Sequence, residues 1–150
     1  MNVSVKATYG ILAALDLALQ NGSAPIQAKA IARRQAIPAR FLEQVLHAMK
    51  KAGIVLSLRG VRGGYVLSKQ PGEISLAEIV EALDGPLTPV TPRRTTSSHL
   101  SDRPKTELVL TPVWERLRQA ELAVLNTATL TELVERHQQL EQKKANMYHI

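Results

Sequence analysis

The sequence contains no cysteine among its 150 residues, which excludes disulfide bonds and thiolate-ligated metal sites. Aromatic side chains are also scarce, with one Trp, one Phe and three Tyr. The longest apolar run, YGILAALDLALQ, is interrupted by Asp16 and is too short to cross a bilayer. No basic segment precedes it, so it does not have the pattern of a secretory signal. We expect a cytoplasmic, mainly helical protein.

Motifs typical of enzymes are missing as well. No serine lies in a nucleophile elbow, and no His/Glu pair has metal-ligand spacing. The glycine-rich stretch GVRGGY, residues 60–65, is followed by an expected strand, whereas a phosphate-binding loop precedes a helix. We therefore expect no enzymatic activity, no catalytic residue, no metal site and no cofactor.

What the sequence does have is positive charge concentrated in one segment. The formal net charge is +6, and residues 27–69 hold nine Lys and Arg against one acidic residue, Glu43. Residues 105–150 hold six basic and six acidic side chains. Such segregation is typical of a protein that binds a polyanion. A basic surface that only keeps the protein soluble is the alternative.

The same segment predicts two helices joined by a tight turn. Residues 27–35 read as a short helix, and Pro38 suits the first turn of a second helix that ends near Gly53. Together they form a helix-turn-helix candidate. On a helical wheel the second helix has an apolar arc of Leu42, Val45, Leu46 and Met49. The opposite arc carries Arg40, Glu43, Gln44, His47 and Lys51. Arg, Glu and Gln pair with base edges in the major groove, although an ordinary solvated face is the alternative.

A β-hairpin is expected directly after this helix. Residues 54–58 and 65–69 alternate like short strands around the turn RGVRGG. A hairpin in this place is the wing of a winged helix. Arg59 and Arg62, set among glycines, are predicted to contact phosphate or a narrow minor groove. The alternative is a solvated hairpin tip whose charge protects a sheet edge.

The remaining chain predicts five more segments. Residues 4–20 form a helix that is apolar on most sides, and Ser75 caps a helix that ends at Gly85, with Glu78 completing a capping box. Residues 86–107 are rich in Pro, Ser and Thr and read as a loop. Two amphipathic helices follow from Thr111, with no expected partner surface inside a minimal winged helix, so we expect them to pair subunits.

Three stretches carry a family resemblance: KATYGILAALDLA, AKAIARRQAIPARFLEQVLHAMKKAGIVLSLRGVRGGYVLSK and ISLAEIVEALDGPL. They resemble the Rrf2 family of bacterial transcription regulators, which includes iron–sulfur cluster, nitrite-sensitive and cysteine-metabolism regulators. The resemblance is close over residues 3–87 and looser through VWERLRQAELAVLNTATLTEL, which is similar to the family's dimerisation helix. It implies a mainly α fold with a small β-hairpin: a winged helix-turn-helix plus a long C-terminal dimerisation helix.

The resemblance also implies a homodimer on double-stranded DNA, and two-fold symmetry predicts an imperfect palindromic operator. Residues implied to face the major groove are Arg40, Phe41, Glu43 and Gln44, and those implied to enter the minor groove are Arg59 and Gly60. Members usually have Pro-Gly where this chain has Val61-Arg62, so Arg62 should add a contact with phosphate or the minor groove. This extra contact could relax specificity.

Many members hold an iron–sulfur cluster with three cysteines in the loop before the dimerisation helix. This chain has Ser97, Ser98 and His99 there, and serine is a poor ligand for such clusters. We expect no cysteine-ligated cluster. Serines standing in place of native cysteines, and ligation by His and carboxylates, are the alternatives.

These observations divide the chain into a winged helix-turn-helix DNA-binding domain over residues 1–86, a flexible sensor-position loop over 87–109, and dimerisation and C-terminal helices over 110–150. Residues 91–106 are expected to be mobile without a ligand. The function expected is a sequence-specific DNA-binding transcription regulator, a dimeric repressor. The alternative is a protein-interaction regulator whose DNA binding is controlled by a partner metabolic enzyme.

Overall fold

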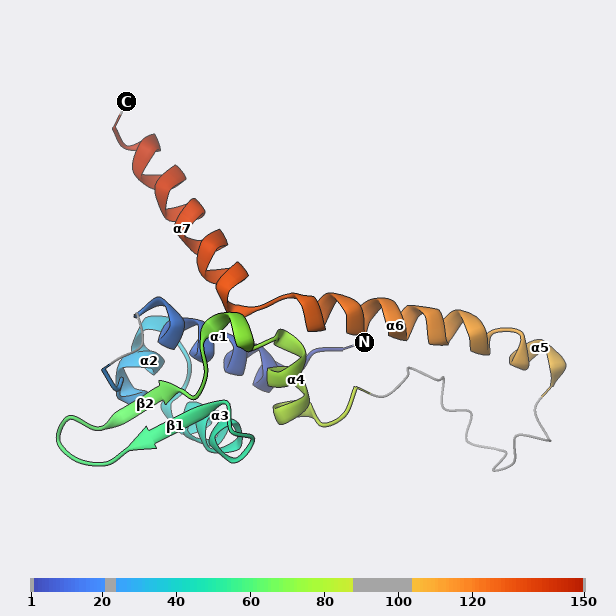
Figure 1. The fold of residues 1–150 in the computed structure, drawn as a ribbon, viewed down its shortest axis with the longest axis horizontal. Coiled ribbons are helices and arrows are strands. Elements are labelled where there is room, and N and C mark those ends of the chain that lie inside the picture. The colour runs from blue at the N-terminus through green and yellow to red at the C-terminus, as the bar shows by residue number, and fades with distance from the viewer. Residues whose placement is uncertain (1, 21–23, 88–103, 150) are drawn as a thin grey trace.

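The computed structural model describes residues 2–20, 24–87 and 104–149. In chain order the elements are α1 (Val5–Leu19), α2 (Ala28–Gln35), α3 (Ala39–Lys51), β1 (Val55–Leu58), β2 (Gly64–Leu67), η1 (Pro71–Glu73), α4 (Leu76–Asp84), α5 (Lys105–Leu108), α6 (Thr111–Thr127) and α7 (Leu130–Met147). The first four α-helices and the hairpin gather into one body, while α6 and α7 extend away from it in different directions (Figure 1). The predicted fold, mainly helical with a two-stranded wing and a long C-terminal helix, is confirmed.

The helix-turn-helix has the predicted form, with an unpredicted detail in its turn. Ala36 follows α2 in a left-handed conformation, with φ 52° and ψ 42°. The backbone N–H of Ile37 then donates to the carbonyl of Ala32 (3.0 Å), which closes the end of α2. Pro38 lies in front of α3, where its missing N–H costs nothing.

The core is centred on α1, which contacts α2, α3, α4 and α7. All four apolar residues predicted for the inner face of α3 are fully buried. On α1, by contrast, the large apolar side chains Ile11, Leu12, Leu15 and Leu19 are half-buried, and apart from Leu17 the buried apolar positions are small residues: Ala7, Gly10, Ala13, Ala14 and Ala18. A Cβ on Gly10 would lie 2.1 Å from Leu83 Cδ1. Small residues therefore let α4 approach α1 closely.

A third strand-like segment, which the sequence analysis did not predict, fixes the wing to the body. The N–H of Ile26 donates to the carbonyl of Tyr65 (2.9 Å), and the N–H of Tyr65 donates to the carbonyl of Ile26 (2.8 Å). Gly64, with φ +151°, makes this approach possible, because a Cβ there would lie 2.5 Å from the carbonyl carbon of Ile26. The hairpin is thus held both by its own ladder and by the segment that leads into α2.

The two C-terminal helices differ from each other. The expectation that both lack a partner surface in their own subunit is wrong for α7, because Leu130 is 0% exposed and Leu133 and Val134 pack against the core. The N–H of Leu130 also donates to the carbonyl of Ile74 (3.1 Å), which ties the start of α7 to the segment before α4. Helix α6 contacts α4 but has no fully buried residue.

The predicted loop is described only at its ends. Residues 88–103, which include Ser97, Ser98 and His99 and most of the segment expected to be mobile, lie outside the described residues. Within the expected loop, residues 105–108 form the short helix α5. No helix in the described ranges is long and apolar enough to span a membrane.

Candidate nucleic-acid interface

The outer face of α3 carries the predicted reading residues. Arg40, Glu43, Gln44, His47 and Lys51 are all exposed. The buried apolar face of the same helix fixes its position, so these side chains project from a rigid support. Within the described chain none of the five makes a hydrogen bond or an ion pair, which leaves their donors and acceptors available to a ligand.

Phe41, also predicted to face DNA, lies in a different environment. It is half-buried and packs against the core, and its ring meets Tyr9 edge to face, with centroids 5.4 Å apart and an interplanar angle of 83°. The structure therefore gives Phe41 a packing contact between α3 and α1. Only part of its ring is open to a ligand.

Glycines set the geometry of the wing tip. The N–H of Gly63 donates to the carbonyl of Gly60 (2.9 Å), and Gly60 has φ +112°. Val61, at the tip, is 97% exposed. Arg59 and Arg62 flank it and are also exposed. The turn thus presents two guanidinium groups on a narrow loop, as the sequence predicted.

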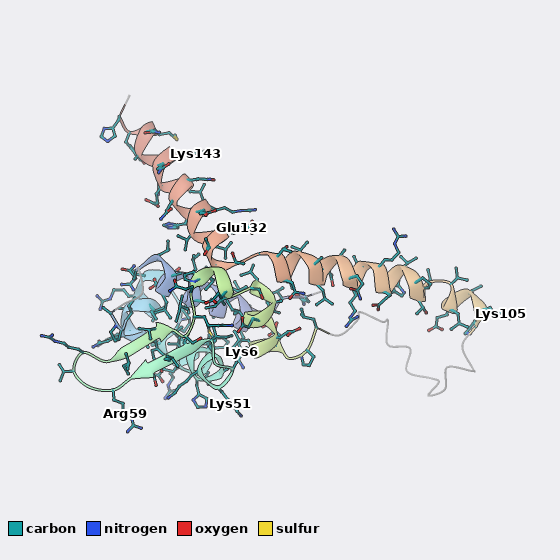
Figure 2. The ribbon with its side chains drawn as sticks, viewed as in Figure 1. Lys6, Lys51, Arg59, Lys105, Glu132 and Lys143 are labelled. Atoms are coloured by element: carbon teal, nitrogen blue, oxygen red, sulfur yellow. The ribbon has the colours of Figure 1, made fainter. Side chains whose placement is uncertain are left out.

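Backbone hydrogen bonds hold the wing beside α3. The N–H of Ile54 donates to the carbonyl of Met49 (2.9 Å), and the N–H of Ser68 donates to the carbonyl of Ile54 (3.0 Å). Lys51 at the end of α3 and Arg59 on the wing point to the same side of the molecule (Figure 2). We call the four exposed cations of α3 and the wing, Arg40, Lys51, Arg59 and Arg62, the basic face.

Most of the positive charge in this region is unopposed. Of the nine Lys and Arg in residues 27–69, two are in ion pairs: Arg34 with Asp16 (2.6 Å) and Lys69 with Glu78 (2.8 Å). The other seven are exposed and have no ion pair in the described part of the chain: Lys29, Arg33, Arg40, Lys50, Lys51, Arg59 and Arg62. Exposed cations without acidic neighbours attract a polyanion over a wide area.

Two ion pairs in the structure were not predicted from the sequence. The Ser75 hydroxyl accepts from the N–H of Glu78 (3.2 Å), but the Glu78 carboxylate pairs with Lys69, so the predicted capping box is half formed. Asp16, noted in the sequence only as an interruption, is buried and bonded to Arg34. That hydrogen bond, with the charge of Asp16, raises the pKa of Arg34 above its ordinary value. A lone aspartate within an apolar run, followed by a basic pair on the next helix, was the available signal.

Metal ligands do not gather anywhere in the described ranges, where no three His, Cys, Asp or Glu lie close enough to hold an ion. Lys51 at the end of α3 and Arg59 on the wing instead lie on one side of the molecule, and Arg40, Glu43, Gln44 and Arg62 of the same two elements are exposed. With its basic charge, this arrangement is suited to nucleic acid.

Comparison with known proteins also points to nucleic-acid binding. A family profile described as an iron-dependent transcriptional regulator, Rrf2, matches residues 3–136. The HTH-type transcriptional regulator CymR of Bacillus subtilis is 35% identical over 133 residues, which cover 89% of this chain and 89% of the relative. The HTH-type transcriptional regulator IscR of Cronobacter sakazakii is 32% identical over 141 residues, covering 94% of this chain and 85% of the relative.

Solved structures show the same fold. The structure of CymR, titled the global cysteine regulator of B. subtilis, superposes with a TM-score of 0.77 at 32% identity and covers 91% of this chain and 98% of that chain. The structure of T. potens IscR superposes with a TM-score of 0.71 at 31% identity and covers 91% of this chain and 88% of that chain.

Proposed function

This chain belongs to the Rrf2 family of transcriptional regulators, and we propose that it acts as a homodimeric repressor that occupies an imperfect palindromic operator. Membership of the family makes it a DNA-binding regulator and not an enzyme. The observation that carries the proposal is the basic face: α3 and the wing present exposed cations without an ion pair in the described chain, and Lys51 and Arg59 point to the same side of the molecule.

In the proposed complex α3 enters the major groove. Glu43 and Gln44 are exposed on its outer face and supply an acceptor and an amide for base edges, while Arg40 can bind guanine or phosphate. The wing follows the DNA backbone, with Arg59 and Gly60 in the minor groove and Arg62 on phosphate. Gly60 suits this position because its bare, left-handed backbone allows close approach.

The proposed dimer is formed through α6. Val113, Leu117 and Val124 are 51%, 47% and 66% exposed and lie within about 40° of one another on a helical wheel. Half-buried residues of α6, among them Trp114 and Leu122, lie on other sides of the helix. An exposed apolar stripe on a long projecting helix favours pairing with an identical stripe. In this division residues 1–86 bind DNA and residues 110–150 pair subunits, with the start of α7 anchored on the DNA-binding body.

A cysteine-ligated iron–sulfur cluster has no part in the proposal. The matching family profile is described by its dependence on iron, but clusters of this kind are held by thiolates. This chain has no cysteine to supply them.

Selection of bound genomic fragments by the purified full chain tests the proposal. We expect an inverted repeat whose half-sites are about one helical turn apart or a multiple of it. A reporter gene behind that sequence should be expressed less when the protein is present. Fragments without a shared motif would contradict operator binding, and increased reporter expression would contradict repression.

A second candidate is regulation by a partner protein, a metabolic enzyme that changes DNA binding. The distal half of α7 favours it, because Leu140, Met147 and Tyr148 are 65%, 78% and 81% exposed there. Immobilised full chain, with and without its operator, can be tested for a partner that binds in only one of the two states. A partner that is lost when Leu140 and Tyr148 are changed to Ser supports this candidate, and unchanged capture by that variant contradicts it.

A further inference from the structure

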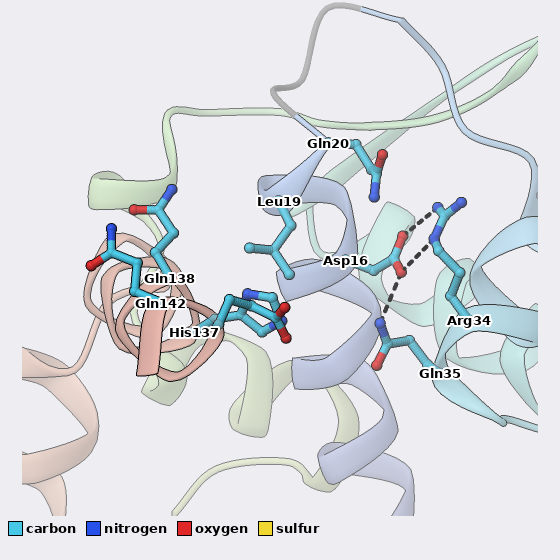
Figure 3. Close-up of a pocket in the computed structure, with 9 residues that line it drawn as sticks. Asp16, Leu19, Gln20, Arg34, Gln35, His137, Gln138 and Gln142 are labelled. Atoms are coloured by element: carbon cyan, nitrogen blue, oxygen red, sulfur yellow. Dashed lines mark hydrogen bonds and ion pairs between the residues drawn. The ribbon is translucent and has the colours of Figure 1, made fainter. Parts of the chain in front are cut away.

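A cavity of about 690 Å³ lies between α7 and the pair α1–α2, and none of its lining residues belongs to the basic face. Its lining includes four glutamines, Gln20, Gln35, Gln138 and Gln142, and the charged residues Asp16, Arg34 and Glu141. Leu19 and His137 complete it. Figure 3 shows His137 reaching from α7 toward α1, with Asp16 held between Arg34 and Gln35 on the other side. A surface that brings amides and charges from three helices together has the composition of a site for a small polar ligand.

One wall of this cavity is rigid. The carboxylate of Asp16 accepts from Arg34 Nε (2.9 Å), Arg34 Nη2 (2.6 Å) and Gln35 Nε2 (2.9 Å). Because the Asp16 side chain is also 2% exposed, it is not available to a ligand. The three bonds leave the Nη1 group of Arg34 without a partner in the described chain, on a side chain that is 40% exposed. This wall can therefore donate hydrogen bonds to a carboxylate.

The opposite wall carries a free carboxylate. Glu141 lies one turn after His137 on α7 and has no hydrogen bond or ion pair within the part of the chain that the structure describes. Another acid of the same helix, Glu132, is in contrast paired with Arg136 (2.7 Å). Asp16 and Arg34 neutralise each other, so the carboxylate of Glu141 is the remaining charged group of the lining.

We propose that this cavity binds a small zwitterion of the free α-amino acid class. The ammonium group pairs with Glu141, and the carboxylate accepts from Arg34 Nη1. The short carbon chain lies against Leu19, and the glutamine amides bind polar side-chain atoms. A simple anion would meet the charge of Glu141 without compensation, and a simple amine would leave the Arg34 donors unused. A ligand with both charges satisfies both walls.

Such a ligand joins α7 to α2, the first helix of the helix-turn-helix. Since α7 continues from α6, occupancy of the cavity also fixes how the projecting arm is oriented on the DNA-binding body. We infer that the amino acid changes operator affinity, and this second step rests on the proposed function. Binding itself does not require it, and can be measured without DNA.

The test is calorimetry of the full chain with each of the twenty common L-amino acids at millimolar concentration. We expect at least one to bind. For each that does, the matching amine without a carboxylate and the matching acid without an ammonium should bind much more weakly. The Glu141→Gln variant should bind about 10- to 100-fold more weakly, the loss expected for one charge-assisted hydrogen bond. Glu135→Gln is the matched control, because Glu135 is exposed on the same helix and does not line the cavity.

Two outcomes overturn the site: no amino acid binds to the folded protein, or Glu141→Gln binds as tightly as the unchanged chain. Circular dichroism on both variants checks that α7 is intact. If an amino acid binds and operator affinity does not change, the site stands and its regulatory role is wrong. Loss of operator binding under all conditions would instead contradict the proposed function.

Discussion

Asp16 on α1 and Arg34 on α2 form an ion pair whose two partners differ sharply in exposure. The Asp16 side chain is 2% exposed and the Arg34 side chain is 40% exposed. If one partner is removed, the side chain that is left keeps its own degree of exposure to water. An unpaired arginine at this position can be hydrated, whereas an unpaired aspartate cannot, so the two halves of the pair are not equivalent in their contribution to folding.

Removal of the arginine should therefore cost more stability than neutralisation of the aspartate. We expect Arg34→Ala to lower the free energy of unfolding by about 3–5 kcal/mol, because it leaves a buried charge. Asp16→Asn should cost about 1–3 kcal/mol, the loss of charge-assisted hydrogen bonds. Urea unfolding at neutral pH measures both. Arg33→Ala is the control, because Arg33 is an exposed neighbour without an ion pair in the described chain. It should change the free energy of unfolding by less than about 0.5 kcal/mol. A larger loss of stability for Asp16→Asn than for Arg34→Ala would contradict this explanation.

The exposed stripe on α6 gives a prediction about assembly. The unchanged protein should be a dimer at micromolar concentration, and Leu117→Glu with Val124→Glu should give monomers that have lost operator binding, because like charges would face each other across the interface. Multi-angle light scattering measures the mass. Asn126→Asp, an exposed change outside the stripe, should remain dimeric. A monomeric unchanged protein would rule out pairing through α6.

Two glycines with positive φ should differ in their tolerance of alanine. Gly64 has φ +151° and would place a Cβ 2.5 Å from the backbone of Ile26, whereas Gly53 has φ +77° and open space around it. Both changes strain the backbone by about 1–2 kcal/mol, but Gly64→Ala must also break the bridge that holds the wing, adding about 1–3 kcal/mol. Equal melting temperatures for the two variants would contradict this role of Gly64.

Much of this architecture could be predicted from local sequence patterns. The inner face of α3 repeats at helical spacing, and the wing turn needs glycine at Gly60, so both follow from nearby residues. The bridge between Ile26 and Tyr65 could not be found in this way, because the partners are far apart in the chain and neither has a distinctive pattern.

The exposure of the proposed DNA-contacting residues could be predicted to a similar extent. The exposure of Arg40, Glu43 and Gln44 follows from the wheel, since they lie opposite the core residues. Phe41 lies at the border between the two arcs, so its packing against Tyr9 depends on the position of α1. The cavity at α7 depends on the return of the chain to α1 after α6, which no local pattern indicates.

Base preference should depend on the outer face of α3. We expect Glu43→Ala and Gln44→Ala each to weaken operator binding by about 1–3 kcal/mol per half-site and to flatten the preference at one base position. His47→Ala, on the same exposed face, is the comparison that shows whether the effect is specific to the first turns of the helix. Selection from random DNA measures the preference. If both variants select the same DNA motif as the unchanged protein, α3 does not recognise the base sequence.

The wing should contribute attraction to DNA that is largely independent of sequence. Arg59 and Arg62 are exposed, have no ion pair in the described chain and flank a glycine turn beside α3. Each phosphate neutralised by a cation contributes about −0.9 to the slope of log affinity against log salt. A dimer has two wings, so replacing both arginines by alanine should make the slope shallower by roughly 2 to 4 units, depending on how many reach phosphate.

The matched control removes the same charge elsewhere. Lys143 and Lys144 are exposed near the end of α7, and their change to alanine should leave the slope unaltered, because release of counterions requires contact with phosphate and not charge alone. Titrations at several salt concentrations, on the operator and on a scrambled duplex, separate two roles for the wing. If both arginines bind phosphate, affinity falls equally for the two duplexes. If Arg59 enters a narrow A·T-rich minor groove, the operator loses more. An unchanged slope without both arginines would mean that the wing does not touch DNA and that its charge only protects an exposed hairpin.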